Sequence, residues 1–146
     1  MCDHCGCRTY PRIAELTDDH ERILELAWRI AEAHRAGDDP GVDRDILMGM
    51  LDAHVAREED GLYPLLSDTG ELSADVRDAL EQEHQDLDAV LTTGQFDRRQ
   101  YYALAAHIEH EETELFPAAM FGFDDQQWEA LGVVHRDHPL PTLQPH

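Results

Sequence analysis

Histidine and glutamate recur in this 146-residue chain at a spacing that suits metal binding. The segment His54-Val-Ala-Arg-Glu58 returns as His107-Ile-Glu-His-Glu111, and each copy continues into a leucine, an aromatic residue and a proline. Residues four apart on a helix project from one face, so each imidazole and the carboxylate that follows it point to the same place. The pattern therefore predicts that each copy supplies two ligands to a metal ion.

A second repeat precedes each of these copies. It places a leucine, an acidic residue, a histidine and an aliphatic residue at the same spacing around His20 and again around His84. The chain is thus a duplicated pair of helices with one more candidate ligand in each half. The candidate metal ligands are His20, His54, Glu58, His84, His107 and Glu111.

Four long helices are needed to position these residues, and apolar periodicity together with turn residues predicts them. We expect helices from Pro11 to the turn at residues 37–41, across residues 46–62 and ending by Thr69, from Ser73 to Thr92, and from Asp97 to about Ala119. Pro64 is expected to kink the second helix or to close its last turn. A short helix over roughly residues 124–135 and an irregular end from Pro139 follow.

The expected fold is all-α, an up-down-up-down antiparallel four-helix bundle with a short extra C-terminal helix. His20 and His54 lie 17 and 14 residues from the turn that joins their helices. At about 1.5 Å per residue, their heights differ by only about 4 to 5 Å. His84 and His107 lie nine and ten residues from the residues that bound their own turn. All four histidines therefore fall at a similar depth in the bundle.

Four imidazoles and two carboxylates in an apolar core are costly unless they are paired, and two metal ions would pair them. Nitrogen and oxygen ligands without a thiolate suit iron, manganese or zinc. Carboxylates from facing helices can bridge two ions, so two histidines and two bridging oxygens give each ion four ligands. An oxo or hydroxo bridge would add a fifth and leave one octahedral position open for a small molecule.

The order and spacing of these residues resemble the hemerythrin-like family, or HHE cation-binding domain, over about residues 12–120. The family pattern of His, H-x-x-x-E, His and H-x-x-x-E falls on the six candidate ligands. The resemblance implies a four-helix bundle that holds a non-heme di-iron centre, cycling between Fe2+ and Fe3+. It also implies dioxygen binding, oxygen or redox sensing, peroxide breakdown or nitric oxide handling, and hence a diatomic or peroxide ligand.

One departure from the family separates this chain from the oxygen-carrying hemerythrins. Those proteins resemble it less well because they place a second histidine four residues after the third-helix ligand, where this chain has Asp88. A reversible oxygen store is thus disfavoured against a reactive or sensing centre. Glu81, Asp88 and His110 lie near enough to the ligand face to supply a further ligand or to hydrogen-bond one. Glu59 and Glu112 flank the proposed bridges and could hydrogen-bond a ligand histidine or face solvent.

Two functions remain open, with a purely structural metal bundle as a third. The first is an enzyme-like di-iron protein that consumes peroxide or nitric oxide, and the second is an oxygen-, redox- or iron-sensing protein without turnover. A ferritin-like carboxylate protein is disfavoured, because that class needs Glu-x-x-His on two helices and only Glu81 and His84 fit.

The charge of the chain excludes several partners. Its 32 acidic residues face 11 basic ones, all of them arginine, for a net charge of -21. Such a surface repels phosphate backbones and anionic lipid, so we expect neither nucleic acid nor membrane as a partner. The sequence has no apolar run of the roughly 20 residues that span a membrane and no basic-then-apolar start. We therefore expect a soluble cytoplasmic protein, and the sequence indicates no particular protein partner.

Three cysteines, Cys2, Cys5 and Cys7, crowd the amino-terminal end. We divide the chain into a cysteine-rich head at residues 1–10, the hemerythrin-like bundle at 11–120, and a short helix with an irregular tail at 121–146. Antiparallel helices in even number return the chain to its starting side, which brings the head near His135 and His138. A Zn2+ site between head and tail, a redox thiol set and an inert tail remain alternatives.

Overall fold

The computed structural model describes residues 10–141, and this part of the chain is all-helical with no strand, as the sequence predicts. Two short π-helical turns, η2 and η3, interrupt the α-helices. The elements are α1 (Pro11–Ala36), α2 (Gly41–Arg57), η2 (Glu58–Leu62), α3 (Tyr63–Asp68), α4 (Ala74–Thr92), α5 (Arg98–His110), η3 (Glu111–Leu115), α6 (Phe116–Gly122) and α7 (Asp125–Asp137).

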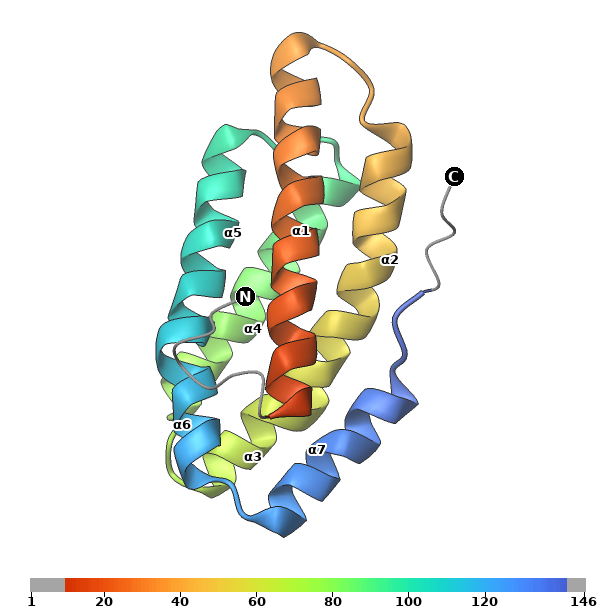
Figure 1. Cartoon of the computed structure of the whole chain (residues 1–146). Coiled ribbons are helices and arrows are strands. Elements are labelled where there is room, and N and C mark those ends of the chain that lie inside the picture. The colour runs from red at the N-terminus through yellow and green to blue at the C-terminus, as the bar shows by residue number, and fades with distance from the viewer. Residues whose placement is uncertain (1–9, 142–146) are drawn as a thin grey trace.

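The long helices lie side by side, and α7 crosses one end of them (Figure 1). The connections from α1 to α2 and from α4 to α5 lie at the same end of the molecule, and the connection from α3 to α4 lies at the other. Helix α7 contacts α1, α2 and η2. The arrangement brings one face of each long helix into a shared interior.

The predicted helix starts at Pro11, Ser73 and Asp97 are confirmed. Pro11 occupies the first turn of α1, where its missing N–H costs nothing. The Ser73 hydroxyl accepts a hydrogen bond from the backbone N–H of Val76, and the Asp97 carboxylate accepts one from Gln100. These caps satisfy backbone donors that a helix leaves unpaired at its start.

Two apolar clusters fill the interior, one toward each end of the bundle. Along α1, Leu16 belongs to the first cluster and Ile23 to the second, and His20 lies between them. Along α5 and η3, Leu104 and Leu115 bracket His107 in the same way. The predicted ligands therefore form a polar layer between two apolar halves.

Both π turns begin at a candidate bridging glutamate, a feature that the sequence analysis did not predict. The N–H of Tyr63 donates to the carbonyl of Glu58, five residues back, and the N–H of Phe116 donates to that of Glu111. A proline follows the aromatic residue in each case and would clash with a carbonyl of a regular helix. The widened turn lets the helix continue past Pro64. Such turns often mark functional sites.

Helix α7 packs against the first π turn at a point where only glycine fits. A Cβ atom added to Gly61 would lie 2.9 Å from Cδ1 of Leu131 and 3.1 Å from Cγ1 of Val134. The guanidinium of Arg57 donates to the backbone carbonyls of His135 and His138 and so binds the end of α7. The short C-terminal helix is thus fixed against the end of α2 and the first π turn.

Within residues 10–141, no helix combines the length and apolar character that a membrane crossing requires.

Candidate metal centre

The six predicted ligand side chains converge in the middle of the bundle. Helices α1, α2, α4 and α5 each contribute a histidine, and the two π turns contribute the glutamates. Glu58 and Glu111 are completely buried, and none of the four histidines exposes more than 8% of its surface. The imidazole Nε2 atoms face the carboxylate oxygens at the centre.

These side chains form two groups that share both glutamates. His20 and His54 join Glu58 and Glu111 in one group, and His84 and His107 join the same pair in the other, with the ligand atoms of each group within 4.8 Å of one another. The four shortest distances from an Nε2 to the nearest carboxylate oxygen run from 3.1 to 3.4 Å. Two ligands at right angles on one ion, each at about 2.1 Å, lie about 3 Å apart. Each group could therefore hold one cation.

Several atoms of this centre have no hydrogen-bond partner. Nε2 of His20, both oxygens of Glu58 and Oε1 of Glu111 are buried without one. Buried charged and polar atoms without partners are costly, because nothing replaces the water that they lose. A cation bound at the centre would contact all of these atoms, so the donor set fits a metal.

Each ligand histidine uses its other ring nitrogen to donate to a carboxylate. The pairs are His20 with Glu112 at 2.8 Å, His54 with Asp19 at 2.9 Å, His84 with Glu59 at 2.6 Å and His107 with Glu83 at 2.8 Å. A carboxylate acceptor on Nδ1 fixes the ring orientation and leaves the Nε2 lone pair facing the centre.

These partners extend the interpretation of the sequence. The sequence left two roles open for Glu59 and Glu112, a hydrogen bond to a ligand histidine or a position facing solvent. In the structure both accept a hydrogen bond from a ligand histidine. The sequence analysis missed Asp19 and Glu83, although an acidic residue stands directly before the first histidine of each half. The repeat of an acidic residue directly before a histidine, Asp19-His20 and Glu83-His84, was the one sequence feature that pointed to these acceptors.

The two halves differ in how these carboxylates are held. Asp19 is buried, and its Oδ2 lies 3.8 Å from Nη1 of Arg57, the residue that binds the end of α7. The Glu83 side chain is 53% exposed. The chain Arg57, Asp19, His54 therefore connects α7 to the centre.

The further candidates Glu81, Asp88 and His110 have other neighbours in the structure. Glu81 accepts a hydrogen bond from Arg77 at 2.9 Å, and His110 lies 2.8 Å from Glu114. Asp88 is exposed and lines a surface groove. None of the three belongs to either group of converging side chains.

The residues proposed for a second site are only partly described. Cys2, Cys5 and Cys7 lie outside the described residues. His135 is buried and donates through Nδ1 to Glu15 at 2.7 Å, while Nε2 of His138 lies 3.4 Å from Asp60. The zinc or redox role of this set stays a prediction.

Without a cation, the carboxylates of the centre stabilise the protonated form of the neighbouring imidazoles. Burial alone would lower the pKa of His54, but the charge of Glu58 and the hydrogen bond to Asp19 raise it to about 9. Burial would likewise lower the pKa of His107, but the hydrogen bond to Glu111 and the charge of Glu111 outweigh this effect and raise the pKa to about 9. Imidazoles with a raised pKa hold protons near neutral pH, and a metal ion must displace them.

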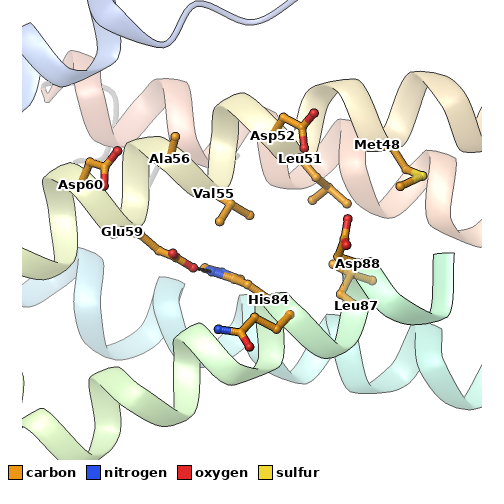
Figure 2. Close-up of a pocket in the computed structure, with 11 residues that line it drawn as sticks. Met48, Leu51, Asp52, Val55, Ala56, Glu59, Asp60, His84, Leu87 and Asp88 are labelled. Atoms are coloured by element: carbon orange, nitrogen blue, oxygen red, sulfur yellow. Dashed lines mark hydrogen bonds and ion pairs between the residues drawn. The ribbon is translucent and has the colours of Figure 1, made fainter. Parts of the chain in front are cut away.

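A groove of about 430 Å³ between α2 and α4 leads toward the centre. Figure 2 shows His84 joined to Glu59 along it, with Leu51 and Leu87 from opposite helices. Leu51, Val55 and Leu87 also line the small space beside the converging ligands. These three side chains, which we call the apolar gate, line both the groove and the space beside the ligands.

The family comparison agrees with this geometry. The family model for the hemerythrin HHE cation binding domain matches residues 12–119, a span that includes all six converging side chains. No curated protein and no solved structure matches the chain significantly. The family match covers about three quarters of the sequence. The chain belongs to the hemerythrin HHE cation-binding domain family.

Proposed function

We propose that the protein holds two iron ions at this centre, within an up-down-up-down four-helix bundle, and binds or reacts with dioxygen, hydrogen peroxide or nitric oxide there. The observation that carries the proposal is the pair of buried glutamates shared by both groups of histidines, with three carboxylate oxygens that lack a hydrogen-bond partner. A bound iron pair would supply reversible electron transfer and an open coordination position.

The chain's own residues limit what can reach this position. The space beside the ligands is walled by aliphatic side chains, and its free volume of about 10 Å³ suits about one water-sized molecule. The wall includes Ile23, Leu104 and Ile108 as well as the apolar gate. Such a space favours a diatomic or peroxide ligand over larger substrates and keeps bulk water away.

Iron loading followed by substrate consumption tests the proposal. Purified protein is loaded anaerobically with Fe2+, the bound iron is counted, and the loss of hydrogen peroxide and of nitric oxide is followed. We expect two ions per chain and consumption that His54→Ala abolishes, since His54 lies within one group of ligands. One bound ion, or equal consumption by the variant, would contradict the proposal.

The alternative is a sensing protein without turnover. The connection from His54 through Asp19 and Arg57 to α7 favours it, because a change at the centre would reach a surface helix. Two bound ions without consumption of either substrate would select this alternative. A change in proteolysis near α7 on oxidation of the bound iron would support it further.

The buried partner of His54 should matter more than the exposed partner of His107. Asp19→Asn keeps the size of the side chain but weakens the acceptor, and we expect about 10- to 100-fold weaker metal binding. Glu83→Gln should cost less, because Glu83 is half exposed and water can take its place. Competition between each variant and a chelator for Mn2+ measures both affinities. Equal losses would show that burial does not set the strength of these contacts.

The stability of the metal-free protein should fall as the pH rises. The pKa of His54 and of His107 is raised to about 9 in the folded protein, against about 6.5 in an unfolded chain. A raised pKa stabilises the fold fully below 6.5, and this contribution is lost as the pH climbs to about 9. Urea unfolding with EDTA at pH 6.5, 7.5 and 9 measures the loss. The metal-loaded protein should show no such fall in stability. A metal-free protein whose stability is the same at all three pH values would contradict the raised pKa of His54 and His107.

The apolar gate should control how fast small molecules arrive. Leu87 lines the groove and the space beside the ligands, so Leu87→Ala opens the path between them. We expect severalfold faster azide binding to the iron-loaded protein, followed by stopped-flow absorbance. Val90→Ala, on the same helix but outside both linings, is the matched control and should leave the rate unchanged. Equal rates in the two variants would place the access route elsewhere.

A further inference from the structure

The two halves of the centre differ at one aromatic position. Tyr63 and Phe116 follow the two π turns and are both buried. Tyr63 stacks on His84 with ring centroids 5.9 Å apart, and Phe116 stacks on His20 at 5.4 Å, each with an interplanar angle of 9°. The two rings therefore occupy equivalent places, and the hydroxyl of Tyr63 is what distinguishes them.

This hydroxyl binds a bridging glutamate from the other half of the chain. The Tyr63 O–H donates to Oε2 of Glu111 at 2.6 Å. Phe116 has no hydroxyl to offer Glu58, and both oxygens of Glu58 lack a hydrogen-bond partner. Glu111 thus presents one free oxygen, Oε1, where Glu58 presents two.

The free oxygens are also placed differently against the histidines. Oε1 of Glu58 lies 3.1 Å from Nε2 of His84, while Oε2 of Glu58 lies 3.3 Å from Nε2 of His54. The two oxygens of this carboxylate therefore face different groups of ligands.

Glu111 faces both groups with the same atom. Its Oε1 lies 3.3 Å from Nε2 of His20 and 3.4 Å from Nε2 of His107. Its Oε2 points instead to the hydroxyl of Tyr63.

We propose that Tyr63 makes the two bridges unequal, so that Glu58 bridges the metal pair through both oxygens and Glu111 bridges it through Oε1 alone. The inference rests on the proposed metal pair and adds a positioning role for Tyr63. The phenol holds Oε2 away from the ions and draws negative charge from the carboxylate through a short hydrogen bond.

A crystal structure of the full chain loaded with Mn2+ tests the geometry directly, after the bound metal has been counted. We expect Oε1 of Glu111 to contact both ions and Oε2 to remain with Tyr63. Two bound ions with both oxygens of Glu111 coordinated would overturn the inference and leave the metal pair intact. Fewer than two ions would contradict the proposed pair, and the inference with it.

Substitutions at the equivalent positions test the role of the hydroxyl. Tyr63→Phe frees Oε2 of Glu111, so the magnetic coupling between two bound Mn2+ ions, measured by electron paramagnetic resonance, should change. The double variant Tyr63→Phe with Phe116→Tyr moves the hydroxyl to the other half and should restore coupling close to that of the wild type. A Tyr63→Phe protein with two ions and an unchanged spectrum would overturn the inference. The Mn2+-loaded wild-type structure decides the matter even if a variant fails to fold.

Discussion

Replacing Glu58 by glutamine is expected to abolish binding of the metal pair. Glu58 is completely buried, belongs to both groups of ligands, and has two oxygens without a hydrogen-bond partner. Glutamine keeps the shape of the side chain but removes the negative charge and one oxygen. Loss of a partner that only supports a ligand costs about 10- to 100-fold in affinity, so loss of a shared ligand should cost more.

Metal analysis after dialysis measures the outcome. We expect the bound metal to fall from two ions per chain to one or none, with the helical circular dichroism retained. Glu114→Gln is the matched control, because it removes the same charge from a side chain that is 69% exposed. A Glu58→Gln protein that keeps two ions through the same dialysis as the wild-type protein would show that Glu58 is not a bridge.

Metal loading should raise the melting temperature on the order of 20 °C. A site at a free metal concentration of about 1,000 times its dissociation constant adds about 4 kcal/mol to folding, so two sites add about 8 kcal/mol. For a domain of this size, 1 kcal/mol shifts the melting temperature by about 3 °C. The cations also replace the missing partners of the buried carboxylates.

Calorimetry of the same sample with EDTA and with excess Mn2+ gives the shift. Glu58→Gln serves as the comparison, since its melting temperature should respond little to metal. A shift of only a few degrees in the wild-type protein at saturating metal would contradict the prediction. It would mean that metal binding adds little to the free energy of unfolding.

The helices and the converging side chains could be predicted because their signals are local. Helix starts at Pro11, Ser73 and Asp97 follow from the chemistry of single residues at helix ends. The four-residue spacing from His54 to Glu58 fixes their shared face whatever the neighbouring helices do. The repeat supplied the remaining information, because the same pattern occurred twice in one chain.

What could not be predicted depends on contacts between helices. The acceptor of each Nδ1 is set by the rotation of one helix against another. Asp19 directly precedes His20 in the sequence but accepts from His54 on the next helix, so its role could not be predicted. The π turn at Glu58 needs a five-residue hydrogen bond that no single letter encodes, although Pro64 marks its place. The hydroxyl of Tyr63 meets Glu111 from the opposite half of the chain, 48 residues away.

The hydrogen bonds to the ligand histidines repeat between the two halves of the chain. Asp19 with His54 lies within the first half, whereas Glu59 reaches across to His84 in the second. The equivalent bond of Glu83 with His107 lies within the second half, and Glu112 reaches back across to His20 in the first. Both halves carry the π turn at the same place. Each half of the chain therefore supplies the same kinds of contact to the centre, as the two subunits of a symmetric homodimer would. Because both halves belong to one chain, one half can carry Tyr63 where the other carries Phe116, an asymmetry that two identical subunits cannot have.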